Sequence, residues 1–335
     1  MSLPSRSAIL ASAFRVPETA VTNDDLATVM DTSDEWIQQR SGIRERHYVD
    51  NDQGASELAA IAARQAVEQA GLTLADIDLV ICATLSPDVD FPGNSSLLCD
   101  RLGLVGVPAF DIRNQCSGFL YLLAIADQYI RTGGARHVLI AGTEVHSTGL
   151  DYSDRGRGVT VLFGDGAGVA VVGPSPDGER GLLSINLHAE GKHADKLCLE
   201  GPSALCKPRF PVDWKITDDY HYPKMNGKYV FRHAVTRMSE CIMEVVEAAG
   251  CTVGDIDMLL PHQANLRINQ MVADILKLDE SRTANNIDRY GNTTAATIPI
   301  LLTETVEAGR IKPGDLVCMA SFGAGFTWGA ALMRW

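Results

Sequence analysis

A cysteine at the start of a predicted helix is the strongest candidate nucleophile in this sequence. Cys116 lies in DIRNQCSGF, directly after the apolar run VPAFDI and before an amphipathic pattern that ends at Gly133. The positive end of a helix dipole lowers the pKa of a thiol placed there and favours the reactive thiolate. Most cysteines only fill small spaces in a core, but this position predicts that Cys116 is a nucleophile.

Two further polar residues stand at junctions between regular elements. His262 follows a buried strand in MLLPHQANLRI, so it should reach the crevice in which α/β folds bind ligands. Asn292, in DRYGNTTAATIP, precedes a helix, where an asparagine usually serves as an N-cap. Each residue alone has a structural explanation. Together with Cys116 they indicate one shared catalytic site.

Two glycine-rich segments remain to be explained. FGDGAG (residues 163–168) precedes an apolar strand, and FGAGFTWG (residues 322–329) follows one. Neither has the Lys-Ser/Thr ending of a phosphate-binding P-loop, and neither carries GxGxxG between a strand and a helix. Tight turns with exposed backbone N–H groups are better suited to stabilising an oxyanion.

The elements around these residues alternate between helix and strand, which predicts an α/β fold. Residues 56–71 show helical spacing and end in glycine, and the apolar runs HVLIAG and DLVCMASFG are typical of buried strands. Residues 66–81 align without gaps on residues 245–260 with eight identical positions of sixteen, at an offset of 245 − 66 = 179. The repeat predicts two similar halves, residues 1–174 and 175–335.

A second pair of segments supports the duplication. Aligning the helix-ending Gly133 with Gly309 gives an offset of 309 − 133 = 176 and sets Cys116 opposite Asn292. Equivalent helix starts would bring both residues into a central site. Residues 190–228 interrupt the pattern with four prolines and no clear period. This segment is expected to be a long ordered loop, either functional or a surface elaboration.

Composition excludes several classes of function. The chain has 335 residues, 46% of them hydrophobic, and a formal net charge of −13, which argues against a nucleic acid partner. No apolar run is long enough for a membrane helix, and the N-terminus lacks a secretory signal, so a cytoplasmic location is expected. The eight cysteines form no CxxC pair and none has the spacing of a zinc site, so no metal is expected.

At these motifs the sequence resembles the β-ketoacyl-acyl-carrier-protein synthase III family, in the thiolase superfamily. The resemblance covers the whole chain and is carried by DTSDEWI, FGDGAG, PHQANLRI, YGNTTAA and FGAGFTWG, in the expected order. It implies a five-layered αβαβα fold, a homodimer, and an acyltransferase without metal or cofactor. Such an enzyme condenses an acyl-CoA primer with malonyl-acyl carrier protein, with loss of CO2, to initiate fatty acid synthesis.

The resemblance also implies roles for matching residues. Cys116 would hold the acyl group, and the backbone N–H groups of Cys116 and Ala324 would form the oxyanion hole. His262 and Asn292 would hydrogen-bond the malonyl thioester carbonyl and stabilise the enolate. The further matches are Trp36 and Arg155 at the CoA adenine, Arg40 near the CoA phosphates, Arg267 at the carrier protein, and Phe91 closing the acyl pocket of a partner subunit.

Three features depart from the usual family pattern. Arg113, Asn114 and Gln115 precede the nucleophile where small residues are common, Ala324 replaces a glycine, and residues 190–228 are longer than expected. The bulk of Phe91 favours a short primer, whereas the altered loop favours a medium-chain one, and the sequence does not decide between them. Nor does it specify the carrier protein or the pathway.

Other functions stay open at this point. A relative with the same fold could condense medium or long acyl thioesters or make a secondary metabolite precursor, but the extra acidic base common in that class is not evident here. A non-catalytic scaffold that binds acyl carrier protein has no need of three catalytic residues. A degradative thiolase needs a second cysteine near the C-terminus, and FGAGFTWG has none.

Overall fold

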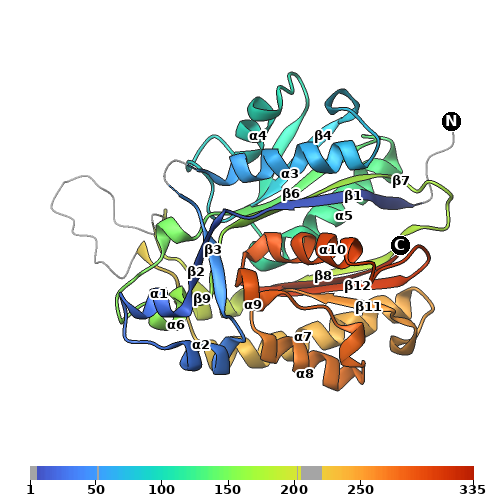
Figure 1. Ribbon diagram of the computed structural model, residues 1–335. Coiled ribbons are helices and arrows are strands. Elements are labelled where there is room, and N and C mark those ends of the chain that lie inside the picture. The colour runs from blue at the N-terminus through green and yellow to red at the C-terminus, as the bar shows by residue number, and fades with distance from the viewer. Residues whose placement is uncertain (1–5, 51–52, 202, 205–220) are drawn as a thin grey trace.

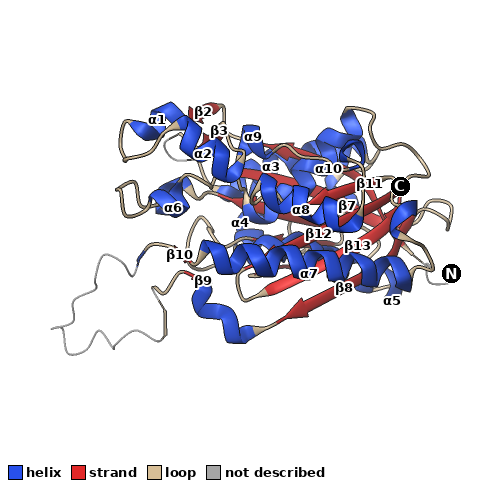
Figure 2. Ribbon diagram, turned by 90° about the horizontal axis from the view of Figure 1, so that it is seen from below, coloured by secondary structure: helices blue, strands red, loops and turns tan. Residues whose placement is uncertain are grey.

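The protein folds into alternating layers of helix and sheet (Figure 1). The structure is a computed structural model that describes residues 6–50, 53–201, 203–204 and 221–335. Helices cover the outer face of each sheet, and further helices lie between the two sheets (Figure 1 and Figure 2). The predictions of an α/β fold and of the five-layered αβαβα arrangement are confirmed. In the described part of the chain no helix combines the length and the apolar character needed to cross a membrane.

The first sheet comes from the N-terminal part of the chain. Its strand order is β1 (Ser7–Arg15), β7 (Gly166–Pro174), β6 (Val138–Glu144), β4 (Leu79–Ala83) and β5 (Ala109–Ile112). Strand β4 runs parallel to β5 and β6, whereas β7 pairs antiparallel with both of its neighbours. The central strands are buried at nearly every position because helices cover both faces of the sheet.

The second sheet is built from the C-terminal part. Its strand order is β11 (Met258–Pro261), β12 (Leu316–Gly323), β13 (Thr327–Arg334) and β8 (Gly181–Ala189). Strand β11 runs parallel to β12, and β13 pairs antiparallel with β12 and β8. Helices α7 (Gly227–Ala248) and α8 (Leu266–Leu276) cover its outer face, while α3 (Ala55–Gln69) and α4 (Asn94–Leu102) cover the first sheet.

The central layer consists of α5 (Gly118–Thr132) and α10 (Thr297–Glu307), which lie between the two sheets. Both helices are apolar on more than one face because each contacts a sheet on either side. Phe119, Leu122 and Leu302 are completely buried there. Each such side chain contributes about 1.5–3 kcal/mol to stability, so the central layer joins the halves into one core.

Shorter elements surround the end of the layers at which the candidate residues lie. They include β2 and β3, which pair antiparallel with each other, and several short helices. Their bounds are β2 (Thr19–Thr22), β3 (Glu45–Tyr48), α1 (Asn23–Ala27), α2 (Asp34–Ser41), η3 (Ser147–Gly149), α6 (Arg157–Thr160) and α9 (Ile287–Tyr290). The turn η7 (Glu280–Arg282) lies near the other end of β11, where Arg282 donates to the Gly254 carbonyl.

The first repeated segment is seen directly in the structure. Helix α3, the 3-10 turn η1 (Leu74–Asp76) and β4 recur as α7, η6 (Val253–Asp255) and β11. Both turns begin with the same capping box, in which a threonine and an aspartate three residues later bond each other's backbone N–H. The offset of 253 − 74 = 179 equals that of the sequence repeat.

The second alignment, which set Cys116 opposite Asn292, is wrong by three residues. The turns that begin α5 and α10 are η2 (Gln115–Ser117) and η8 (Thr294–Ala296), each opening with a residue at positive φ, and 294 − 115 = 179. Cys116 is therefore equivalent to Ala295. Matching the terminal glycines misplaced the helix starts because α5 has 15 residues and α10 has 11.

The segment predicted as a long loop, residues 190–228, is partly regular. It contains η4 (Gly191–Lys196), and β9 (Leu197–Cys198) pairs antiparallel with β10 (Lys224–Met225). Asn226 caps α7, so helix replaces loop from Gly227 onward. Residues 202 and 205–220 lie outside the described part of the chain.

Close contact between β6 and η8 predicts that Gly142 tolerates no side chain. A Cβ at Gly142 would lie 2.6 Å from the carbonyl carbon of Ala295. We expect Gly142→Ala to lower the free energy of unfolding by about 1–3 kcal/mol, because backbone must move to make room. Gly149→Ala, at an exposed position with open space, should change it by less than about 0.5 kcal/mol. Urea unfolding measures both; equal values would contradict the packing argument.

Candidate active site

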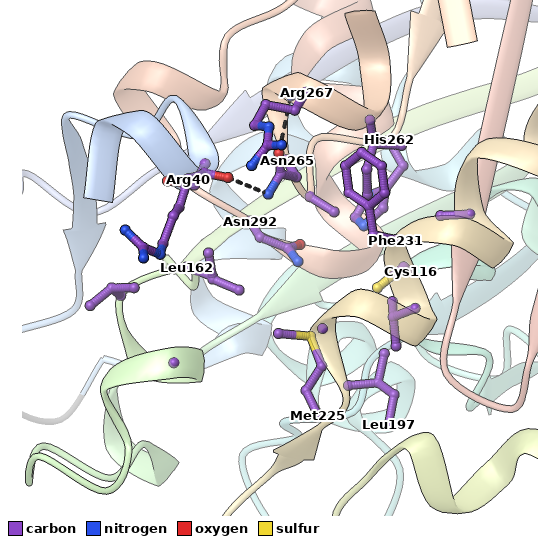
Figure 3. A pocket seen from close by; sticks show the side chains of 18 of the residues that line it. Arg40, Cys116, Leu162, Leu197, Met225, Phe231, His262, Asn265, Arg267 and Asn292 are labelled. Atoms are coloured by element: carbon purple, nitrogen blue, oxygen red, sulfur yellow. Dashed lines mark hydrogen bonds between the residues drawn. The ribbon is translucent and has the colours of Figure 1, made fainter. Parts of the chain in front are cut away.

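A cavity of about 550 Å³ brings together six of the predicted site residues. Cys116, His262 and Asn292 converge on one space within it (Figure 3), and they are only 9%, 3% and 5% exposed. Trp36, Arg40 and Arg267 line the same cavity. Arg155, Phe91 and Ala324 do not line it. Reactive groups are thus buried within a pocket whose rim carries arginines.

Cys116 is held in a sharp turn between β5 and α5. Gln115, immediately before it, has a φ of 43°, an uncommon value for a residue other than glycine. The Ser321 hydroxyl donates to the carbonyl oxygen of Cys116 over 2.6 Å. A Cβ at Gly323 would lie 2.9 Å from the Cβ of Cys116. The end of β12 can therefore support the nucleophile only because residue 323 is glycine.

The protonation state of Cys116 differs from the sequence prediction. Burial, with a smaller contribution from the Glu144 carboxylate, raises the pKa of the Cys116 thiol to about 12. The lowered pKa predicted from the helix start is therefore wrong for this closed arrangement, in which desolvation outweighs the helix terminus. Burial therefore favours the protonated thiol at neutral pH.

His262 is positioned by β11 and by the helix that follows η8. Its backbone N–H donates to Ala320 of β12 over 2.8 Å, which continues the parallel strand pairing by one residue. Its Nδ1 lies 2.6 Å from the Thr297 hydroxyl, and its Nε2 is buried without a protein partner. Burial lowers the pKa of His262 to about 3, so the ring is neutral. A neutral imidazole can donate one hydrogen bond into the cavity.

Asn292 lies before η8 and does not cap a helix. Its backbone N–H donates to Leu162 over 2.8 Å, and its carbonyl accepts from Gly164 over 3.1 Å, which ties it to the FGDGAG segment. Its Oδ1 accepts the backbone N–H of Thr294 over 2.8 Å. The side-chain NH2 group is thus left as the donor toward the cavity.

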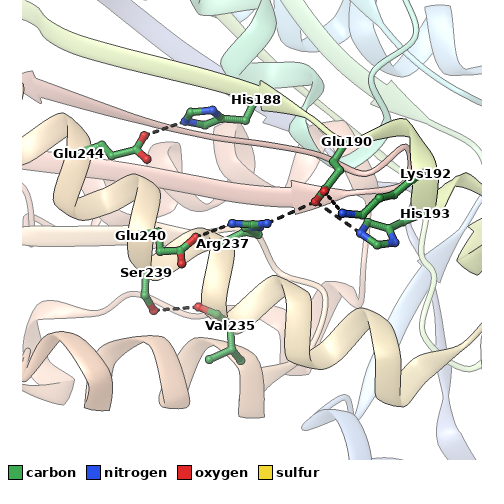
Figure 4. A network of polar contacts seen from close by, with 9 residues as sticks. All are labelled: His188, Glu190, Lys192, His193, Val235, Arg237, Ser239, Glu240 and Glu244. Carbon is green, nitrogen blue, oxygen red and sulfur yellow. Dashed lines mark hydrogen bonds and ion pairs between the residues drawn. The ribbon is translucent and has the colours of Figure 1, made fainter.

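The turn predicted to supply an oxyanion donor lies between β12 and β13, beside Cys116. Thr327 links this turn to η2, because its hydroxyl lies 2.7 Å from the Ser117 hydroxyl and donates to the Ala324 carbonyl over 3.1 Å. Glu190 and Phe326 exchange two backbone hydrogen bonds, of 2.8 and 3.0 Å. Figure 4 shows the Glu190 carboxylate in an ion-pair network with Lys192, His193 and Arg237. The turn is therefore tied both to η2 and to the start of the 190–228 segment.

The mouth of the cavity carries an aromatic ring between arginines. The guanidinium carbon of Arg40 lies 4.1 Å from the centre of the Trp36 ring, and that of Arg157 lies 5.0 Å from it. Arg155, the arginine predicted to act with Trp36, instead pairs with Asp151 over 2.6 Å and lies over the Tyr222 ring. Arg157 was missed because nothing in the sequence distinguishes it from its neighbours.

Arg267 lies exposed at the same mouth, with its guanidinium 5.7 Å from the centre of the Phe231 ring. Lys228, also exposed, lines the cavity beside it. Phe91, on the loop between β4 and α4, is 86% exposed and lies away from the cavity of its own chain. Arg113 is exposed, and Asn114 and Gln115 do not line the cavity either.

Sequence reasoning missed two features of the site. Glu144, at the end of β6, is completely buried, and this burial raises the pKa of its carboxyl to about 7. Hydrogen bonds from Ser86, Leu85 and Thr84 lower the pKa, but their effect is smaller. The position of Glu144 after the apolar run HVLIAGT could have indicated it. The second feature is an apolar wall of the cavity formed by Leu197, Met225 and Phe231 (Figure 3). Leu197 and Met225 belong to the segment that showed no period, whereas Phe231 lies in α7.

One group of three possible metal ligands occurs in the described residues, outside the cavity. The ligand atoms of His188, Cys241 and Glu244 lie within 4.8 Å of one another. They already have partners, because His188 pairs with Glu244 over 2.7 Å (Figure 4) and the fully buried Cys241 donates to the Asn186 carbonyl.

The raised pKa of Cys116 predicts its reactivity with iodoacetamide. Because only the thiolate reacts, the alkylation rate should rise about tenfold per pH unit between about pH 7 and pH 9, without a plateau. Intact-mass analysis over time measures the rate, with Cys116→Ala to identify labelling of other cysteines. A plateau below about pH 8 would show a low-pKa thiolate and contradict the effect of burial.

Comparisons with known proteins match the sequence and the fold of this chain. Residues 110–191 match the family described as 3-oxoacyl-[acyl-carrier-protein] synthase III, and residues 246–335 match the C-terminal part of that synthase. The β-ketoacyl-[acyl-carrier-protein] synthase III of Rhodospirillum centenum is 44% identical, over 99% of this chain and 100% of its own length. The synthase III of Symbiobacterium thermophilum is 46% identical, over 96% of this chain and 95% of its own length.

Solved structures agree over nearly the whole chain. The 3-oxoacyl-[acyl-carrier-protein] synthase III of Aquifex aeolicus superposes with a TM-score of 0.89 at 39% identity, covering 98% of this chain and 100% of its own. A priming β-ketosynthase from a polyketide biosynthetic pathway gives 0.90 at 33% identity, covering 100% and 98%. This chain therefore belongs to the β-ketoacyl-[acyl-carrier-protein] synthase III family.

Proposed function

We propose that this protein is a β-ketoacyl-acyl-carrier-protein synthase III, an acyltransferase that initiates fatty acid synthesis. It condenses an acyl-CoA primer with malonyl-acyl carrier protein through an acyl-cysteine intermediate. The observation that carries the proposal is the convergence of a buried thiol, a neutral imidazole and an amide at one cavity. These groups supply a nucleophile and two hydrogen-bond donors, which is the chemistry that a decarboxylative condensation needs.

In the first half-reaction the Cys116 sulfur attacks the thioester carbonyl of acyl-CoA. The bond from that carbon to the CoA sulfur breaks, and the thiol proton ends on CoA. The backbone N–H groups of Cys116 and Ala324 stabilise the tetrahedral oxyanion between these events. Support for this role comes from the close packing of Gly323 on Cys116 and the hydroxyl contact between Ser117 and Thr327.

In the second half-reaction malonyl-acyl carrier protein binds with its thioester carbonyl between His262 and Asn292. Both residues donate hydrogen bonds, and these strengthen as CO2 leaves and the carbonyl becomes an enolate. The enolate carbon attacks the acyl carbonyl on Cys116, and the Cys116 sulfur leaves as a thiolate to give β-ketoacyl-acyl carrier protein. The thiolate then takes up a proton from solvent, which restores the thiol. A neutral His262, kept so by burial, suits this donor role.

The mouth of the cavity suits the carriers of both substrates. The Trp36 ring can stack on the adenine of CoA, and the Arg40 guanidinium can pair with its phosphates. Arg157, which lies by the Trp36 ring, takes the adenine-binding role that the sequence assigned to Arg155. Arg267 forms, with Arg40 and Lys228, a local basic rim on a chain of net charge −13. That rim is the docking site for the acidic carrier protein.

The proposal includes a cytoplasmic homodimer that requires no metal or cofactor. Family membership supports these points, and the 86% exposure of Phe91 is consistent with a side chain that closes the acyl pocket of a partner subunit.

A second candidate is a condensing enzyme for medium or long acyl thioesters or for a secondary metabolite precursor. The apolar wall of Leu197, Met225 and Phe231 favours it, because such a wall suits more than a two-carbon primer. The likeness to a polyketide priming synthase points the same way.

Acyl transfer predicts a covalent adduct on one residue. Intact-mass spectrometry after mixing with acyl-CoAs of about two to twelve carbons should show one acyl group per chain on the wild type and none on Cys116→Ala. The preferred chain length decides between the two candidates. An adduct of equal amount on the variant, or none with any chain, would refute the mechanism and favour a non-catalytic carrier-binding protein.

Separate half-reactions predict separable defects. His262→Ala and Asn292→Ala should each lower the rate of condensation by about 100- to 1000-fold, because each removes a donor to the developing enolate. Acylation of Cys116, followed by mass, should persist in both variants. Loss of acylation together with condensation would place these residues in the first half-reaction instead.

A further inference from the structure

A threonine hydroxyl contacts the catalytic imidazole on the side away from the cavity. Thr297 is the first residue of α10, is 2% exposed, and places its Oγ1 2.6 Å from Nδ1 of His262. The other ring nitrogen, Nε2, is the atom buried without a protein partner. Because a neutral imidazole carries its proton on one nitrogen only, the bond at Nδ1 determines what Nε2 presents to a substrate.

The Thr297 hydroxyl has one hydrogen and two acceptors within reach. It can donate to the Thr294 carbonyl over 3.0 Å, or to Nδ1 of His262 over the shorter distance of 2.6 Å. In the first case Nδ1 carries the ring proton and Nε2 is a bare acceptor. In the second case Nε2 carries the proton and is a donor. The Thr294 carbonyl also accepts the backbone N–H of Thr297, so it keeps a partner in both cases.

We propose that Thr297 is a positioning residue for condensation, whose hydroxyl donates to Nδ1 and so keeps the proton of neutral His262 on Nε2. The inference rests on the proposed function and deepens it, because the malonyl carbonyl needs a donor at Nε2. A bare Nε2 would repel the same oxygen. The change from one His262 tautomer to the other moves no net charge into or out of the site.

The relative strength of the hydrogen bonds favours this arrangement during the reaction. A bond from Nε2–H to an enolate oxygen is charge-assisted and roughly twice as strong as a neutral bond. In the competing arrangement Thr297 donates to the Thr294 carbonyl, which gains only one further neutral bond because that carbonyl already accepts the backbone N–H of Thr297. Formation of the enolate therefore selects the state in which Thr297 donates to His262.

Helix α10 also offers a matched control. Thr305 is 3% exposed, and its hydroxyl donates to the Leu301 carbonyl over 2.6 Å, the ordinary bond of a threonine to the preceding turn. Thr305→Val removes a hydroxyl from the same helix without touching His262. A structural effect of losing such a bond should be equal in the two variants.

The test compares Thr297→Val, Thr297→Ser and Thr305→Val in steady-state condensation and in acylation by intact mass. Thr297→Val should lower kcat of condensation about 10- to 100-fold, since Nδ1 loses its donor, with KM for malonyl-acyl carrier protein and the acylation of Cys116 little changed. Thr297→Ser should restore the rate to within about threefold, and Thr305→Val should match the wild type.

A spectroscopic measurement reports the tautomer itself. In 15N-histidine-labelled protein, assigned with His262→Ala, His262 should carry its proton on Nε2 when an amide analogue of malonyl-CoA is bound, and Thr297→Val should shift the population toward Nδ1. Wild-type kcat in Thr297→Val, or the same tautomer in both proteins, would overturn the inference. Undiminished condensation in His262→Ala would instead refute the proposed function, so the two failures are distinguishable.

Discussion

Close packing of two backbone turns at the centre of the molecule is the constraint on which the rest of the structure depends. The turns η2 and η8 begin the two helices that lie between the sheets, and they meet where a Cβ on Gly118 would lie 3.2 Å from the Cβ of Ala295. Gly142 and Gly323 approach the same turns from β6 and β12. Because backbone replaces side chain at these contacts, Cys116 and Asn292 can share one cavity although they come from different halves.

The same packing determines the electrostatics of the site. It excludes water from Cys116 and His262, so burial raises the pKa of the thiol and lowers that of the imidazole. The site therefore holds two neutral groups and not a thiolate–imidazolium pair. Neutral groups suit a reaction in which charge develops on the substrate oxygen, because hydrogen bonds aimed at that oxygen act in a region of low dielectric. Glu144 adds a buried carboxyl near the thiol and opposes its ionisation further.

The polarity of the cavity lining differs between its apolar part and its basic rim. Apolar side chains from β9, β10 and the start of α7 line part of the cavity, and Arg40, Arg267 and Lys228 line its rim. An apolar region and a basic region are thus parts of one cavity. The described ends of the 190–228 segment connect both regions to the turn after β12, through the backbone pairing of Glu190 with Phe326.

Spacing and motif order alone determined the element types, the α/β class and the residues Cys116, His262 and Asn292, because these depend on neighbours within a few positions. Tertiary structure decided the rest. The pKa of Cys116 follows from its burial in the folded chain, and Trp36 contacts Arg157 as well as Arg40, although the sequence did not single out Arg157. His262 contacts Thr297 across 35 residues. Desolvation and side-chain pairing depend on atoms that are distant in the chain, so no local pattern records them.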